Sequence, residues 1–180
     1  MSPLNCPYSK NINQIMTTYH LSATPKTKKQ VQEAQLQIES NVSKWVQTYA
    51  DTITENYFQY HVRTLKGNLS GNYPEYAKEQ LDAIENGTAN LMKFKVYSGK
   101  KYYKIVQQEF ETWEGSKNFN QYRDGSVHAF VNKETGEVFK PASWAAPAKH
   151  VRYDLRIIKH REFLFNSNNT GWAGGYLYIR

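Results

Sequence analysis

Apolar side chains between residues 27 and 66 follow a helical period. They recur every three or four positions, and the segment from Lys26 to Lys66 contains neither glycine nor proline. The recurring positions are Val31, Ala34, Ile38, Val42, Trp45, Tyr49, Ile53, Tyr57 and Tyr60. This spacing predicts one long amphipathic helix, or two helices with a shallow break at 50–54, where β-branched residues lower helix propensity. Gly67 is expected to end the helix, and its apolar stripe is expected to form core or to contact a partner helix.

A shorter helical segment follows a polar loop. Pro74 suits the first turn of a helix, Leu81 and Ile84 fall on one side of it, and Gly87 is a stop signal. We expect this helix to pack against the long one as a hairpin. The segment 1–26 has no sustained period and is expected to form an N-terminal arm.

After Leu91 the apolar period becomes two, which is typical of strands. The segment MKFKVYSGKKYYKIVQQEF predicts a hairpin that turns at Ser98 and Gly99. A second hairpin is predicted for SVHAFVNKETGEVFKP, where Gly136 suits the turn position that needs positive φ. The segments VRYDLRII, REFLF and GGYLYIR predict two or three further short elements, with GWAGG as a turn or bulge before a last strand.

These patterns predict an α+β fold in which a long N-terminal helix, or a helical hairpin, precedes a small antiparallel β-sheet. A chain of 180 residues is long enough for one domain with a real core. We divide it into an arm (1–26), a helical region (27–91) and a basic β-rich region (92–180), and we expect one compact domain overall. The 14 tyrosines suit half-buried sheet faces and interaction surfaces.

The net charge of +7 lies entirely in the second half of the chain. Residues 1–91 hold 8 basic and 8 acidic side chains, whereas residues 92–180 hold 15 basic and 8 acidic ones. This asymmetry favours an acidic partner for the second half, and nucleic acid is the most common partner of that kind. The alternative is that the surplus only keeps a small domain soluble.

Two clusters of basic and aromatic residues carry most of that surplus. The first comprises Lys93, Lys95, Lys100, Lys101 and Lys104, with Tyr97, Tyr102 and Tyr103 interleaved. The second comprises Lys140, Lys149, His150, Arg152, Arg156, Lys159, His160 and Arg161, with Trp144 and Tyr153 among them. Because cations follow phosphates and aromatic rings stack on bases, both clusters are candidate nucleic-acid contacts. Alternating lysines also guard exposed sheet edges, so this second interpretation stays open.

Little in the chain indicates catalysis. Cys6 is the single cysteine, so an intrachain disulfide is excluded. The five histidines lack the spacing of a zinc site, and the glycine patterns of phosphate-binding loops and of serine hydrolases do not occur. Glu109 and Glu111 fit a solvent-facing strand edge as well as an acid–base pair. The sequence therefore predicts no catalytic residues, no metal and no cofactor, and it favours a function without catalysis.

The run SVHAFVNKETGEVFKPASWAAPAKHVRYDL resembles a stretch of small uncharacterised proteins of tailed bacteriophages, marine phages in particular. The resemblance covers about 30 residues and implies a phage origin, but it implies no mechanism. Within the run, Pro141 and Pro147 restrict φ and predict a stiff arch between Lys140 and Lys149. Trp144 is expected to plug the edge of the sheet.

We therefore predict a phage accessory protein that binds nucleic acid without catalysis through its basic β-rich half. The long helix is expected to pack on the sheet or to form a homo-oligomer. The alternatives are a virion structural or assembly protein, or a factor directed at a small molecule or at a phage or host protein. The N-terminus lacks the apolar core of a signal peptide, and no stretch approaches the ~18 apolar residues of a membrane helix, which predicts the host cytoplasm or the virion and no membrane contact.

Overall fold

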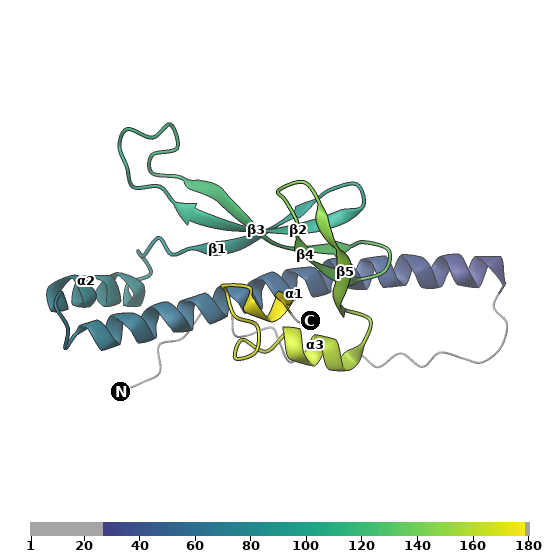
Figure 1. Ribbon diagram of the computed structural model, residues 1–180, viewed down its shortest axis with the longest axis horizontal. Helices are drawn as coiled ribbons and strands as arrows, with labels where there is room; N and C mark the ends of the chain where they lie inside the picture. The colour runs from purple at the N-terminus through teal and green to yellow at the C-terminus, as the bar shows by residue number, and fades with distance from the viewer. Residues whose placement is uncertain (1–26, 179–180) are drawn as a thin grey trace.

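In the computed structural model, which describes residues 27–178, a long helix lies along one face of a five-stranded sheet (Figure 1). The helices are α1 (Lys28–Asn68), α2 (Pro74–Glu85) and α3 (Ile158–Leu164), and η2 (Gly175–Tyr178) is a short 3-10 helix. The strands are β1 (Lys93–Ser98), β2 (Tyr102–Phe110), β3 (Tyr122–Asn132), β4 (Glu137–Pro141) and β5 (Pro147–Asp154). The predicted α+β fold is confirmed, and the predicted arm lies outside the described residues.

Helix α1 is continuous over 41 residues, which decides between the two predicted alternatives. It begins with a capping box, in which Thr27 Oγ1 accepts from the Gln30 backbone N–H and Gln30 Oε1 accepts from the Thr27 backbone N–H. At the expected break, Thr52 and Thr54 donate their hydroxyls to carbonyls four residues earlier, at 2.8 and 2.9 Å. Both threonines are buried against the rest of the protein, so tertiary packing overrides their weak helix propensity.

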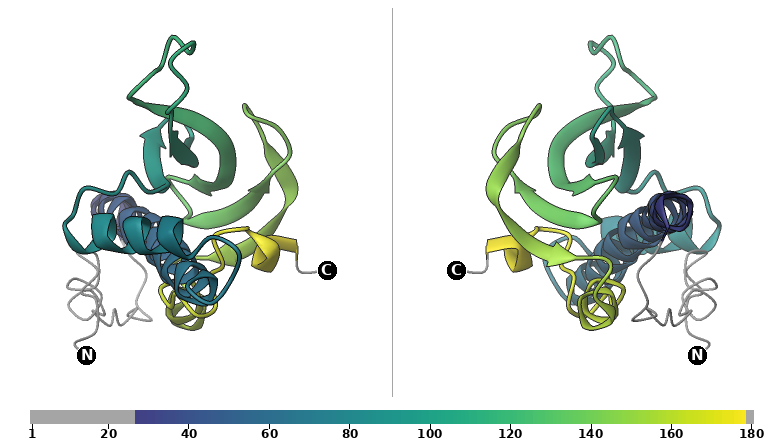
Figure 2. Two further views of the ribbon diagram at one scale, coloured as in Figure 1. Left: turned by 90° about the vertical axis from the view of Figure 1, so that its left-hand side faces the viewer. Right: turned by 90° about the vertical axis from the view of Figure 1, so that its right-hand side faces the viewer.

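The strands form a simple antiparallel meander in which β1 to β5 are neighbours in chain order. Register shifts interrupt the β2–β3 pair next to Val106 and the β4–β5 pair next to Phe139. Bulges of this kind bend and twist a strand. The sheet accordingly curls, and the face turned away from α1 is concave (Figure 2).

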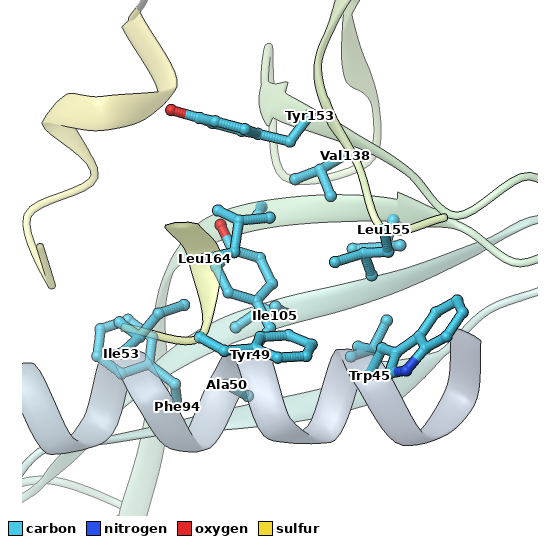
Figure 3. Close-up of a cluster of buried hydrophobic side chains, with 14 of the residues drawn as sticks. Trp45, Tyr49, Ala50, Ile53, Phe94, Ile105, Val138, Tyr153, Leu155 and Leu164 are labelled. Atoms are coloured by element: carbon cyan, nitrogen blue, oxygen red, sulfur yellow. The ribbon is translucent and has the colours of Figure 1, made fainter. Parts of the chain in front are cut away.

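The main core lies between α1, the sheet and the C-terminal segment (Figure 3). Its members share near-complete burial, and they include Trp45, Tyr49 and Ile53 of α1, Ile105, Val131 and Val138 of the sheet, and Leu164 and Leu177. The predicted apolar stripe of α1 is therefore core over its central part. Towards its N-terminal end the same helix leaves Val31 and Leu36 exposed.

The C-terminal segment differs from the prediction of a last strand. Gly174 adopts φ 76°, and the Leu177 backbone N–H donates to the Gly174 carbonyl at 3.0 Å, so the chain closes into η2 instead of pairing with the sheet. Leu177 is only 1% exposed because it packs into the main core. The apolar residues that predicted a strand thus form a helical turn, η2, which covers the main core.

A second, smaller apolar cluster lies on the concave face of the sheet. Val106, Val127, Phe130 and Phe139 form it, and Tyr97 and Tyr102 pack against it. Within residues 27–178, no helix has both the length and the apolar character needed to cross a membrane.

Candidate functional site

The concave face of the sheet brings lysines and aromatic rings into direct contact. We call this surface the lysine–aromatic face and define it as Lys95, Tyr97, Lys101, Tyr102, Lys104, Phe130, Phe139 and Trp144. Its residues come from β1, β2, β3, β4 and the turns that follow β1 and β4. Residues as far apart in sequence as Lys95 and Trp144 therefore meet on one surface.

Strand alternation explains how these residues reach the same face. On β1, Phe94 and Val96 pack into the main core, while Lys95 and Tyr97 alternate with them and lie on the other side. β2 alternates in the same way, with Tyr103 and Ile105 in the main core and Tyr102 and Val106 in the second cluster. The register shift beside Val106 instead skips His128 on β3, so that Val127 and Phe130 share the concave face although they are three positions apart. The bulge is a feature that the alternation of the sequence does not reveal.

Lys104 occupies the centre of the face. Its Nζ lies 4.5 Å from the centroid of the Trp144 ring and 5.8 Å from that of Phe130. Lys101 Nζ lies 5.5 Å from the Tyr102 ring. These distances are within the range of cation–π attraction, so the rings hold the lysine side chains in place while their ammonium groups keep donors for a ligand.

The aromatic rings of the face form a packed layer. Tyr102 meets both Phe130 and Phe139 edge to face, with ring centroids 6.0 Å apart in each pair. Phe130 and Phe139 are buried, whereas Tyr102 is half-buried and lies above them. The accessible part of the layer is therefore Tyr102 together with Trp144.

Trp144 is presented by the turn between β4 and β5, and the prediction that it plugs a sheet edge is wrong. The side chain is 49% exposed, and its ring faces Lys104 on β2. Ser143 Oγ accepts from the backbone N–H groups of Ala145 and Ala146, and the Ala142 N–H donates to the Ala146 carbonyl. The turn is thus closed by hydrogen bonds of its own, and it holds the Trp144 ring over the lysine–aromatic face.

One carboxylate adjoins the face. Tyr97 Oη donates to Asp124 at 2.8 Å, and Gln108 Nε2 also donates to Asp124 at 2.8 Å. Burial, followed by the nearby Asp124 carboxylate, raises the pKa of Tyr97 above its usual value. Tyr97 is therefore a neutral hydrogen-bonding group at neutral pH, and its ring is fixed at the β1 side of the face.

Three other residues that the sequence predicted as nucleic-acid contacts are not members of the lysine–aromatic face, and each of them contacts another side chain of the protein. Tyr103 packs on the main core, with Lys133 Nζ 4.9 Å from its ring. Lys140 Nζ lies 3.8 Å from the Tyr178 ring of η2. Lys93, in contrast, lies on the same side of β1 as Lys95 and Tyr97, with its Nζ 3.6 Å from the Tyr122 ring next to the far end of the β2–β3 hairpin.

The second predicted cluster does not gather on one surface. Arg156 forms an ion pair of 2.7 Å with Asp154. Arg161 is 5% exposed, lies 4.3 Å from the Trp45 ring and donates to the Leu155 carbonyl, so it is a structural residue and no surface contact. Of the other members, Lys149 and His150 are exposed on β5, Lys159 is exposed on α3, and Arg152 is half-buried on β5. His160 Nδ1 accepts from the Asp154 backbone N–H at 2.9 Å. Lys100 of the first cluster is exposed in the β1–β2 turn.

A buried polar chain in the main core was not predicted. His128 Nε2 and Tyr176 Oη are hydrogen-bonded at 2.8 Å, and Tyr176 Oη is also hydrogen-bonded to Tyr49 Oη. Burial lowers the pKa of His128 to about 4 and raises the pKa values of both tyrosines. A lone histidine in a strand gives no sign of such a chain, because its partners come from α1 and η2. In the described range 27–178, no three His, Cys, Asp or Glu side chains are arranged to hold a metal ion.

The comparison with known proteins gives one match. A family described as a family of unknown function (DUF7717) matches residues 26–179. No curated protein and no solved structure matches the chain. The matched range includes α1, the whole sheet and η2, and thus every residue of the lysine–aromatic face.

Proposed function

This chain belongs to the family of unknown function DUF7717, and we propose that it binds single-stranded nucleic acid through the lysine–aromatic face without catalysing a reaction. The observation that carries the proposal is the position of Lys104 between the Phe130 and Trp144 rings, with Lys101 and Tyr102 beside it. A cation and an accessible ring at one place supply both contacts that a nucleotide requires. The lysine meets the phosphate, and the ring stacks on the base.

The chemistry of the face favours a single strand over a duplex. A base stacks on a protein ring only when its own face is free, which is the state of an unpaired base. Tyr102 and Trp144 offer such rings, with Lys101 beside Tyr102 and Lys104 beside Trp144. Lys95 adds an exposed cation next to Tyr97.

The distribution of charge sets the direction of the phosphate path. Residues 92–108 contain five lysines and no acidic side chain, whereas residues 109–124 contain four acidic and two basic side chains. Phosphates are attracted to the first segment and repelled by the second. We therefore place the bound strand across the β1–β2 hairpin and the β4–β5 turn, away from the far end of the β2–β3 hairpin. The predicted origin in a tailed phage is part of the same proposal, and it rests on the resemblance of the β3–β5 segment.

The test is the salt dependence of binding to a labelled oligothymidine of about 16 nucleotides, measured by fluorescence anisotropy. Replacing Lys95, Lys101 and Lys104 by glutamine removes three cations from the face. At about 0.7 per phosphate contact on a single strand, the slope of log K against log salt should fall by about 2. Over a fourfold rise in salt, the wild type should lose about 18-fold more affinity than the variant, since each lost contact accounts for about 2.6-fold.

A matched control removes the same charge elsewhere. Replacing Lys28, Lys29 and Lys66 of α1 by glutamine alters net charge equally, and all three are exposed on the helix. The control should keep the wild-type slope. Trp144→Ala should weaken binding about 5- to 150-fold without changing the slope, because base stacking contributes about 1–3 kcal/mol and involves no counterion. The proposal fails if the wild type does not bind at about 50 mM salt, or if the two triple variants lose the same slope.

A further inference from the structure

The far end of the β2–β3 hairpin forms a projecting finger, residues 109–124, that carries two exposed aromatic rings. Trp113 is 69% exposed and Phe119 is 43% exposed, although neither contributes to the two apolar clusters of the protein. The finger extends away from α1 and α3 in every view (Figures 1 and 2). Large rings displayed at the end of an ordered projection are typical of a protein contact, where tryptophan supplies much of the binding energy.

The finger is a structured element with fixed side chains. Backbone hydrogen bonds of 2.9 Å join Glu111 to Gln121 and Asn120 to Glu111 at its neck. Arg123 forms ion pairs with Glu109 and Glu111, at 2.9 and 3.1 Å. Such pre-organisation lowers the entropy lost when a partner binds.

Gly115 positions the tryptophan. A Cβ added at Gly115 would lie 2.5 Å from Trp113 Cζ2, so the indole rests directly on the glycine backbone. The ring is thereby held across the tip of the finger with most of its surface open to a partner.

The finger is also an acidic segment within a basic half. Its four carboxylates, Glu109, Glu111, Glu114 and Asp124, exceed its two cations, Lys117 and Arg123. Residues 125–180 hold eight basic and four acidic side chains. The finger therefore matches a partner surface that is apolar and positively charged.

This chain carries such a surface at the corner between β5 and α3. Four consecutive residues, Arg156 to Lys159, are exposed there, and the two in the middle are isoleucines. Ile157 is 46% exposed and Ile158 is 44% exposed. We call these four residues the β5–α3 corner. It combines exposed aliphatic side chains with the ammonium group of Lys159, while Arg156 on the other flank is paired with Asp154. The apolar side chains and Lys159 complement the aromatic, acidic finger.

We propose that the finger of one copy docks on the β5–α3 corner of a second copy, with Trp113 and Phe119 on the isoleucines and Glu114 facing Lys159. In Figures 1 and 2 the finger projects from one side of the sheet and α3 lies on the other side. A finger therefore cannot reach the β5–α3 corner of its own chain. When two copies exchange the contact reciprocally, it closes a two-fold dimer, and when each finger meets a further copy it generates a ring or an open chain. This assembly does not depend on nucleic acid, so its success or failure is separate from that of the proposed binding function.

The test is sedimentation velocity of the nucleic-acid-free protein across a range of concentrations. The wild type should associate, and Trp113→Ala combined with Phe119→Ala should weaken association by about tenfold or more, as expected for the removal of central aromatic contacts. A wild type that stays monomeric at every concentration overturns the proposal. So does association that the double variant leaves unchanged, which would indicate another interface such as the predicted one on α1.

Charge reversal provides a second test that is independent of the aromatic contacts. Glu114→Lys alone and Lys159→Glu alone should each weaken association, because each places like charges opposite one another. An equimolar mixture of the two variants should associate as the wild type does, since each finger then meets a corner of opposite charge. Glu79→Lys, an exposed substitution on α2, is the matched control and should change nothing. Failure of the mixture to recover overturns the proposed pairing.

Discussion

Acidification should destabilise the fold through the imidazole of His128. The ring is 8% exposed, lies edge to face with Phe94 at 5.1 Å and is hydrogen-bonded to Tyr176. Burial lowers its pKa from 6.5 to about 4 because the charged imidazolium loses its hydration. The neighbouring phenols of Tyr49 and Tyr176, whose pKa values burial raises, stay neutral and do not compensate that loss.

The sign and size of the effect follow from proton linkage. Between the two pKa values the unfolded chain binds more protons than the folded one, so the free energy of unfolding falls as the pH falls. The contribution of His128 is complete above the unfolded pKa of 6.5 and is lost progressively towards the folded pKa of about 4. At 1.36 kcal/mol per pKa unit, the loss is about 2 kcal/mol near pH ~5 and about 3 kcal/mol near pH ~4.

Urea unfolding followed by tryptophan fluorescence at pH ~7 and pH ~5 measures this loss. His128→Gln removes the titrating ring and keeps a side chain that can reach the Tyr176 hydroxyl. Carboxylates and the other histidines, including His61, whose pKa is lowered by burial, contribute to both proteins alike. The wild type should therefore lose about 2 kcal/mol more than the variant over this interval. Equal losses in the two proteins would refute the assignment of the pH dependence to His128.

Two further variants test the division between structure and binding. Arg161→Gln removes the guanidinium that contacts Trp45 and the Leu155 carbonyl, and it should lower the free energy of unfolding by about 1.5–3 kcal/mol. Its nucleic-acid salt slope should equal that of the wild type, and a slope reduced by about 0.7 would place Arg161 at the interface instead. Leu177→Ala should lower the free energy of unfolding by about 2–5 kcal/mol through the cavity it leaves in the main core, as measured by urea unfolding. A loss below about 1 kcal/mol would mean that η2 contributes little to the core.

The order of helices and hairpins could be predicted because it depends on short-range periodicity. The spacing of Trp45, Tyr49 and Ile53 indicates a helix wherever their partners lie, and the alternation on β1 indicates a strand. The curl of the sheet could not be predicted, since it depends on bulges that open only when β2 and β4 are paired. The form of η2 was missed for a related reason. Its apolar residues suit either a strand or a helical turn, and the main core selects the turn.

The candidate site shows the same limit. The lysines of β1 and β2 could be grouped because two adjoining strands place them on one hairpin. Sequence proximity was misleading for the second cluster, since Arg156 and Arg161 are engaged by Asp154 and Trp45 within the fold. The sequence gives the number of basic side chains in a segment, but the packing of the folded protein decides which of them are exposed to solvent. Nothing in the sequence around Trp113 indicated that its side chain would be exposed, because the exposure results from the shape of the finger in the folded protein.

The connection between Tyr49 and Tyr176 has a consequence for the order in which the chain folds. Each hairpin of the meander joins strands that are neighbours in sequence, so the sheet can assemble step by step during synthesis. The apolar face of α1, in contrast, is made first and receives Leu164 and Leu177 last. Until those residues leave the ribosome, Tyr49 and Ile53 have no cover on that side. Until Leu164 and Leu177 are synthesised, the nascent protein therefore exposes that side of α1 as an open hydrophobic surface, the kind of surface that makes folding intermediates prone to aggregate.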